Sequence, residues 1–257
     1  MIKEYFRPES VDETVKLLTE SEKPRSPLGG GTRISRNQAD YDGIVDLQAA
    51  GLDKIKAKAR SVTIGAMVRL DTLIGHNKVH PEIQRAIRID ASQNIRNMAS
   101  LGGWLVSSDG RSITTTILLA LDSNLTWEPE RKGIRIGDWL PLREIESPGV
   151  LMTEAEWSIS PYLTFEYVGR SPKDKPILIV AAAQWGSGRT RIALGGFGKM
   201  PIVAMDGPND QGADVACRDA YAEAEDEWAT AHYRRNVASK LALRCLNRID
   251  AIKESEV

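Results

Sequence analysis

Cysteine and histidine are scarce in this chain of 257 residues. Cys217 and Cys245 stand alone, with no second cysteine at close spacing and no histidine nearby, and the three histidines are scattered. A zinc site needs clustered Cys, His or carboxylate ligands, and a cysteine-ligated iron–sulfur cluster needs several thiolates. We therefore expect no metal site and no iron–sulfur cluster within this chain.

Long apolar runs and an excess of one charge are also lacking. No run of about eighteen uncharged apolar residues occurs, and the first residues, Met1–Tyr5, contain no apolar signal-peptide segment. The 34 Lys and Arg residues nearly cancel the 35 Asp and Glu residues. A net field that would attract nucleic acid or an anionic membrane is therefore absent. These features predict a cytoplasmic protein with no membrane span and no nucleic-acid partner.

Glycine, by contrast, is grouped at two places. Leu28-Gly29-Gly30-Gly31-Thr32 follows a short segment with proline, and Ser100-Leu101-Gly102-Gly103 follows a predicted helix. Glycine reaches positive φ at low cost, so successive amide N–H groups can turn toward one anion. Glycine pairs nevertheless mark ordinary turns more often than ligand loops. Neither a P-loop nor a strand-GxGxxG-helix unit surrounds the first cluster. Both clusters thus remain candidates for contact with a phosphate.

The remaining pattern predicts an α+β protein in two parts. Before the first glycine cluster we expect a strand, a helix and a strand, with Ser10 opening the helix in a capping box. After it we expect strands, one of them at 134–136, and helices up to a connection at Arg143–Gly149, with the second glycine cluster in a loop. Beyond the connection we expect three antiparallel strands and two helices, at 214–227 and 231–249, packed on their apolar face. The glycines at 186–188 and 195–198 are expected in hairpin turns.

The order of several short motifs resembles one known family. The motifs are Arg25–Thr32, Ile64–Ala66, Ile95–Gly103, Leu118–Asp122, Arg191–Gly196 and Tyr233–Arg235. In the FAD-binding medium subunit of molybdenum hydroxylases, the xanthine dehydrogenase and carbon monoxide dehydrogenase group, the matching segments read L-A-G-G-T, I-G-A, I-R-N-x-A-T-I-G-G-N, L-L-A-L-D, R-I-A-L-G-G and Y-R-R. Each motif is short, but their shared order covers nearly the whole chain.

The resemblance implies a fold and a cofactor. The fold would be a vanillyl-alcohol-oxidase-like FAD-binding domain of two α+β subdomains at 1–155, followed by a small C-terminal antiparallel sheet with helices at 156–257. Both glycine clusters would hold the pyrophosphate of FAD. By this resemblance the cofactor-binding residues are Leu28, Gly29, Gly30, Gly31, Thr32, Arg33, Ile34, Ser100, Leu101, Gly102, Gly103, Trp104, Val150 and Leu151. No catalytic residue is expected, because the redox chemistry belongs to the cofactor.

Four side chains depart from the family pattern. Arg33 replaces a small polar residue, and either pairs with a phosphate or is solvated. Trp104 replaces an Asn, and either stacks on a cofactor ring or fills the core. Ile113 stands where many relatives have Asp, which removes a carboxylate for the adenosine part of FAD. Glu166 replaces a Lys and reverses a charge that could face the diphosphate, while Arg170 nearby is retained.

Three functions follow as hypotheses. The first is an electron-transferring flavoprotein subunit that contacts a small iron–sulfur (2Fe-2S) subunit and a large molybdopterin subunit, and passes electrons through FAD to NAD or another acceptor. The second is a flavin-free scaffold subunit of the same kind of complex. The third is a stand-alone flavin oxidase, which is disfavoured because no substrate-binding constellation is evident. Flavin content and partner association distinguish them.

Overall fold

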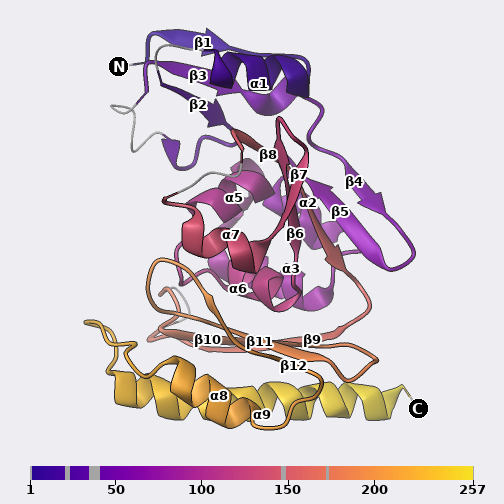
Figure 1. Cartoon of the computed structure of the whole chain (residues 1–257), viewed down its shortest axis with the longest axis vertical. Coiled ribbons are helices and arrows are strands. Elements are labelled where there is room, and N and C mark those ends of the chain that lie inside the picture. Colours follow the sequence, from indigo (N-terminus) through magenta and orange to yellow (C-terminus); the bar gives the residue numbers. More distant parts are fainter. Residues whose placement is uncertain (1, 21–23, 35–40, 146–148, 172–173, 257) are drawn as a thin grey trace. The chain divides into compact units, whose positions relative to one another are not determined.

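The computed structural model of this protein describes residues 2–20, 24–34, 41–145, 149–171 and 174–256 (Figure 1). The chain divides into two compact units. The first unit consists of residues 1–78, 91–107 and 124–156, and the second of residues 79–90, 108–123 and 157–257. Within the described residues, no helix combines the length and the apolar character that a membrane span requires.

The first unit begins with a three-stranded parallel sheet in the order β1-β3-β2. Helix α1 contacts β2 and β3 of this sheet. The helix forms as its capping pattern predicts, because the hydroxyl of Ser10 accepts a hydrogen bond from the amide of Glu13 at 3.2 Å. The short helix η3 follows β3. These elements span Glu4–Phe6 (β1), Val11–Thr19 (α1), Arg25–Leu28 (β2), Gly43–Asp46 (β3) and Leu47–Ala49 (η3).

A five-stranded sheet in the order β4-β5-β8-β6-β7 forms the rest of the first unit, together with four short helices. Its central strands alternate buried and half-buried residues, as expected for a sheet with one face in a core. The elements are Ile55–Ala57 (β4), Ser61–Gly65 (β5), Leu70–Gly75 (α2), Gln93–Met98 (α4), Leu101–Ser107 (α5), Asn124–Glu128 (β6), Lys132–Arg135 (β7), Ile136–Leu142 (α7) and Leu151–Ser158 (β8).

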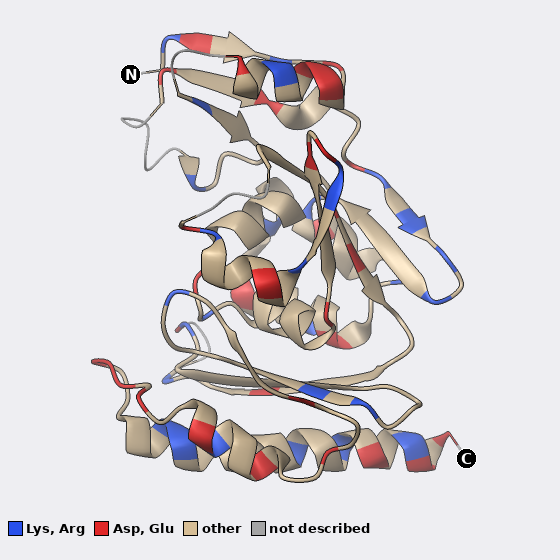
Figure 2. Ribbon diagram, viewed as in Figure 1, with Lys and Arg blue, Asp and Glu red and all other residues tan. Residues whose placement is uncertain are grey.

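The second unit is built on a four-stranded antiparallel sheet in the order β12-β11-β10-β9. Alternate residues of β10, Leu178, Val180 and Ala182, pack with the apolar side chains of α8 and α9 in one buried core. Lys and Arg residues recur along the long helix α9 (Figure 2). The elements are Tyr162–Val168 (β9), Leu178–Gln184 (β10), Thr190–Gly195 (β11), Ile202–Gly207 (β12), Ala213–Ala220 (α8) and Ala231–Ser255 (α9).

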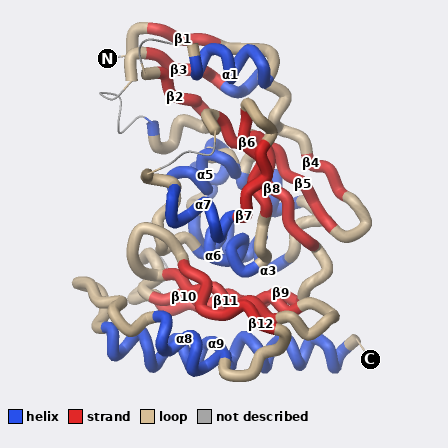
Figure 3. Tube along the Cα trace, viewed as in Figure 1, coloured by secondary structure: helices blue, strands red, loops and turns tan. Residues whose placement is uncertain are grey.

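The other face of this sheet is covered by α3 (Pro81–Asp90) and α6 (Ile113–Ala120), so that the sheet lies between two helical layers (Figure 3). Every residue of α6 is buried. A Cβ on Gly195 of β11 would lie only 2.4 Å from the hydroxyl of Thr116. Glycine therefore permits the close contact between α6 and β11. Both helices come from the first 155 residues of the chain, so the compact units do not follow a single cut in the sequence.

Most predicted elements are present, with four corrections. The second glycine cluster does not lie in a loop, because Leu101–Gly103 form the first turn of α5. The strand expected at 134–136 ends at Arg135, and α7 follows it. A fourth C-terminal strand, β12, pairs with β11, and the helix expected to reach Glu227 ends at Ala220. Residues 146–148 of the expected connection lie outside the described residues.

The hairpin turns are confirmed, except that Gly195 is the last residue of β11. Gly186–Gly188 connect β10 to β11, where the amide of Gly188 donates to the carbonyl of Trp185 at 2.8 Å. Gly196 and Gly198 lie between the antiparallel strands β11 and β12, and both have positive φ. These glycines serve the turns that connect neighbouring strands of the second unit.

Candidate functional site

The first glycine cluster leaves the C-terminal end of β2. Gly31 has a φ of 72°, in the left-handed region that favours glycine. Within the described part of the chain, the amides of Gly30, Gly31 and Thr32 donate no hydrogen bond. Three consecutive free N–H groups beside a positive φ are the donors from which an anion-binding nest is made.

The two glycine clusters lie against each other, although they are distant in the sequence. A Cβ on Gly29 would lie 2.7 Å from the Oγ of Ser100, and a Cβ on Gly30 would lie 1.6 Å from the carbonyl oxygen of Met98. Such distances are far inside van der Waals contact, so only glycine allows this approach. The structure thus brings Leu28–Thr32 and Ser100–Gly103 together, as the sequence predicts.

The amides of the second cluster have partners within the chain. Leu101 donates to the carbonyl of Val68 at 2.9 Å, and Gly102 donates to the carbonyl of Ala66 at 2.8 Å. The amide of Gly103 donates to the Oγ of Ser100 at 3.3 Å. These bonds, and the burial of Leu101 and Leu105 one turn apart, explain why α5 begins here rather than a loop. Among the described residues of this junction, the amides without an acceptor in the chain thus include those of Gly30, Gly31 and Thr32 in the first cluster and that of Ser100 in the second.

The other predicted residues around the clusters differ in exposure. Thr32, Ile34 and Trp104 are half-buried, and Arg33 is exposed. Val150 is partly exposed, and its amide donates to the carbonyl of Glu128 at 2.9 Å. The last of the set, Leu151, is buried in the small apolar cluster with Leu47, Ala50 and Leu52. The side chain of Leu151 is thus a core residue of the first unit.

Asp90, the last residue of α3, lies at the N-terminal end of α6, where Ile113 stands. Its oxygens accept hydrogen bonds from the amides of Ile113 at 2.9 Å and Thr114 at 2.7 Å, and from the hydroxyl of Ser112 at 3.0 Å. Burial raises the pKa of Asp90, and these hydrogen bonds oppose that shift. The sequence gives no signal for this role, because Asp90 lies at the C-terminal end of its own helix and reaches the first turn of α6 only in the folded chain.

Glu166, where the family has a Lys, is paired within the second unit. Its carboxylate lies 2.8 Å from the guanidinium of Arg248 on α9, which also contacts Glu82 of α3 at 2.8 Å. Coulombic attraction to the two carboxylates and their hydrogen bonds raise the pKa of Arg248, against the effect of burial. The reversed charge at Glu166 is therefore neutralised by α9.

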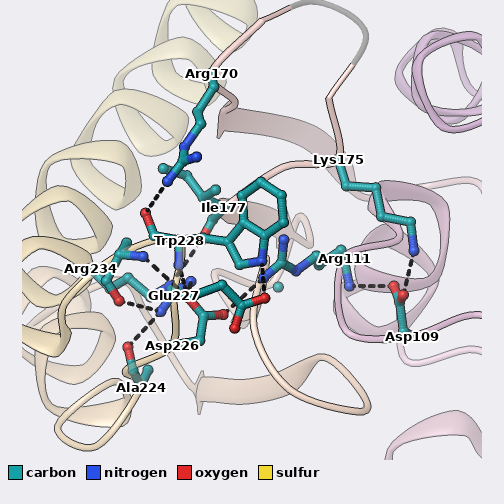
Figure 4. A network of polar contacts seen from close by, with 12 residues as sticks. Asp109, Arg111, Arg170, Lys175, Ile177, Ala224, Asp226, Glu227, Trp228 and Arg234 are labelled. Carbon is teal, nitrogen blue, oxygen red and sulfur yellow. Dashed lines mark hydrogen bonds and ion pairs between the residues drawn. The ribbon is translucent and has the colours of Figure 1, made fainter.

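Arg170 and the Y-R-R motif belong to a polar network around the turn before α9 (Figure 4). Arg170 donates to the carbonyl of Trp228 at 3.3 Å and lies over its ring, with 4.8 Å to the centroid. Arg234 is fully buried and donates to the carboxylate of Asp226 at 2.7 Å. Asp226 also pairs with Arg111 at 2.9 Å. These residues fix the turn that leads into α9.

The residues of the junction fit a diphosphate. The first cluster combines three free amides, one positive φ and two glycines whose missing side chains leave room for the second cluster. Among the described residues, no group of three or more His, Cys, Asp or Glu side chains is placed to hold a metal ion. The chemistry that these residues support is the binding of an anionic group by backbone donors.

The comparisons with known proteins point to one family. The chain is 25% identical over 249 residues to the uncharacterized protein YgfM of Escherichia coli K12, with 94% of each chain covered. It is 25% identical over 279 residues to the carbon monoxide dehydrogenase medium chain of Afipia carboxidovorans, with 96% of each covered. Among solved structures, carbon monoxide dehydrogenase from Hydrogenophaga pseudoflava matches its fold with a TM-score of 0.82 at 22% identity, covering 98% of each chain.

The family match covers the part of the chain that carries both glycine clusters. Residues 1–150 match the family described as the FAD binding domain in molybdopterin dehydrogenase. The expected resemblance and the expected cofactor are thereby confirmed. The chain belongs to this FAD-binding family of molybdopterin dehydrogenases and is the FAD-binding component of an oxidoreductase.

Proposed function

We propose that this chain is the electron-transferring flavoprotein subunit of a molybdopterin-dependent hydroxylase or dehydrogenase. It passes electrons from an iron–sulfur subunit through FAD to NAD or another acceptor. The observation that carries the proposal is the junction of the two glycine clusters, where Gly30, Gly31 and Thr32 present free amides. A diphosphate-linked cofactor suits this donor set, and the family match to residues 1–150 supports FAD.

Each cluster has its own part in this proposal. Leu28–Thr32 bind the diphosphate through backbone amides, and Arg33 adds a positive charge beside them. Ser100–Gly103 set the shape of the junction, because the Ser100 hydroxyl faces Gly29 and holds the amide of Gly103. FAD supplies one- and two-electron redox chemistry when bound. No side chain of this chain needs to act as acid, base or nucleophile.

The proposed partners are a small 2Fe-2S subunit and a large molybdopterin subunit. The name medium chain in the relative from Afipia carboxidovorans supports a multi-subunit complex. We also propose that residues 1–155 act as the vanillyl-alcohol-oxidase-like FAD-binding domain of two subdomains, and residues 156–257 as the C-terminal domain of the subunit. The family match, which ends at residue 150, supports this assignment.

Flavin content tests the proposal. The purified chain should be yellow and should release FAD on denaturation, or should take up added FAD stoichiometrically. Colourless protein that fails to take up FAD would contradict the flavoprotein assignment. If such protein still purified with an iron–sulfur protein, the result would support the flavin-free scaffold instead.

The acceptor is tested by running its step in reverse. If NAD accepts electrons from the bound FAD, NADH added without oxygen should bleach the visible flavin band of the FAD-loaded chain. An unchanged band, in protein whose flavin dithionite does reduce, would indicate that NAD is not the acceptor. The FAD-binding role would be unaffected by that result.

A further inference from the structure

The junction of the glycine clusters has fewer free backbone donors than the sequence predicts. The amides of Leu101, Gly102 and Gly103 already donate to acceptors of the chain itself, so that the second cluster contributes only the amide of Ser100 beside those of Gly30, Gly31 and Thr32. A diphosphate carries negative charge that neutral amides compensate only partly. Trp104 also replaces the amide side chain of the family pattern. A cationic side chain beside the junction would supply the missing charge.

Arg69 is placed at this junction by backbone pairing. It forms an isolated antiparallel bridge with Ser100. Two hydrogen bonds beside the bridge hold it, from Leu70 N to the carbonyl of Ala99 at 3.0 Å and from Leu101 N to the carbonyl of Val68 at 2.9 Å. Residues directly opposite in an antiparallel pair carry their side chains on the same face. The side chain of Arg69 therefore starts on the face that Ser100 presents.

That face is where the two glycine clusters meet. The Oγ of Ser100 lies 2.7 Å from the place of a Cβ on Gly29 and holds the amide of Gly103. An arginine that starts beside Ser100 has a flexible apolar stem and a charged end that stays in water. Its guanidinium can thus reach an anion bound at the first cluster while it remains solvated in the absence of one.

Arg69 also has its charge available. It is exposed, and within the described part of the chain its guanidinium forms no ion pair or hydrogen bond. Two other arginines of the same unit already form ion pairs, since Arg96 contacts Asp71 at 3.4 Å and Arg25 contacts Glu4 at 3.1 Å. A planar guanidinium with several N–H donors binds phosphate oxygens well. Arg33, which directly follows the first cluster in the sequence, is also exposed.

We propose that Arg69 is a diphosphate-binding residue, which contacts FAD across the bridge with Ser100 and supplies charge that the second glycine cluster does not. This inference rests on the proposed function. It adds a residue that lies outside both glycine motifs.

The test is the dissociation constant of FAD for the flavin-free full-length chain, measured by quenching of flavin fluorescence. We compare the wild type with Arg69→Gln, Arg69→Lys and the control Lys132→Gln. Lys132 is an exposed cation of the same unit on the edge strand β7, which β6 separates from β8. The titrations run at about 0.01 M and about 0.5 M salt, because screening weakens ionic contacts at the higher value. ADP, which has the diphosphate without the flavin, serves as a competing probe.

We expect Arg69→Gln to raise the dissociation constants of FAD and ADP by about tenfold at low salt and by a smaller factor at high salt. Arg69→Lys should recover part of the loss, and Lys132→Gln should match the wild type. Equal affinities of Arg69→Gln and Lys132→Gln would overturn the inference alone. A loss for FAD without a loss for ADP would also overturn it, by placing Arg69 away from the diphosphate. A wild-type chain that binds no FAD would overturn the proposed function and this inference together.

Discussion

At the scale of single residues, the glycines of the two clusters have different structural roles. Gly31 supplies a positive φ, whereas Gly29 and Gly30 allow two segments to touch. Gly102 is buried, and a Cβ there would lie 2.8 Å from the Cβ of Ala66, which follows β5. A motif that looks uniform in the sequence therefore combines a backbone conformation, a close contact and a packing position.

Gly30→Ala should test the close contact. The added methyl would overlap the carbonyl of Met98, which is backbone and must move with its helix. We expect a loss of about 1–3 kcal/mol in the free energy of unfolding, measured with urea, together with loss of bound FAD. The matched control is Gly75→Ala at the end of α2, where a Cβ meets no atom within 4 Å. A Gly30→Ala protein as stable as that control would contradict the contact.

At the scale of elements, helix ends are held by side chains from other elements. The carboxylate of Asp90, at the end of α3, accepts hydrogen bonds from two amides in the first turn of α6. The two helices are therefore joined by hydrogen bonds as well as by apolar packing. The turn before α9 is held by Asp226 and Arg234 in a similar way. Both arrangements satisfy amides or charges that the fold has removed from water.

Asp90→Ala should destabilise the second unit by about 2–4 kcal/mol, because it leaves the buried amides of Ile113 and Thr114 without an acceptor. Asp90→Asn should lose less, since its amide oxygen still accepts one hydrogen bond and it buries no charge. The free energy of unfolding in urea measures both. Equal losses for Ala and Asn would show that the capping bonds contribute little.

The turn before α9 should make stability depend on pH. Burial acts to raise the pKa of Asp226, but hydrogen bonds from Arg234 and from the amides of Trp228 and Ala229 outweigh it and lower the pKa. The unfolded chain then binds this proton more readily than the folded chain. The contribution is therefore complete above about pH 4 and is lost as the pH falls through the lower folded pKa.

Asp226→Asn should remove this dependence. At pH 7 the variant should lose about 3–5 kcal/mol, because the buried guanidinium of Arg234 loses its carboxylate. Between about pH 4 and pH 2 its stability should fall less steeply than that of the wild type. Thermal melts over this range give both results. The control Asp219→Asn, on the exposed surface of α8, should keep the wild-type slope, and a wild-type slope in Asp226→Asn would contradict the assignment.

At the scale of the whole molecule, the chain order and the compact units differ. Two segments, 79–90 and 108–123, lie between parts of the first unit in the sequence but belong to the second unit. There α3 and α6 cover the sheet face opposite α8 and α9. Both cysteines are buried in the core between this sheet and its two C-terminal helices. Burial raises the pKa of each thiol to about 12, so neither is a reactive thiolate at neutral pH.

FAD should stabilise the folded chain by mass action. At a free FAD concentration one hundred times the dissociation constant, the gain is about 2.7 kcal/mol, or about 5–10 °C in the thermal midpoint followed by circular dichroism. The Gly30→Ala protein should gain much less. A midpoint of the wild type that FAD leaves unchanged would contradict binding to the folded state.

The sequence by itself determined the family, the cofactor and most of the elements. Local signals sufficed where one segment decides its own structure: the capping box at Ser10, the alternating strands, and the hairpin glycines at 186–188. The ordered motifs added the family, because their spacing spans nearly the whole chain. The use of each cluster in binding stays a prediction.

The tertiary structure decided what depends on contacts between distant segments. The sequence could not show that the amides of Leu101 and Gly102 donate to the carbonyls of Val68 and Ala66, or that Asp90 caps α6. Nor could it assign α3 and α6 to the second unit, because burial by a distant sheet is not visible in local periodicity. A glycine motif specifies where the backbone can turn, whereas the free donors of that backbone are fixed only when every neighbouring acceptor is in place.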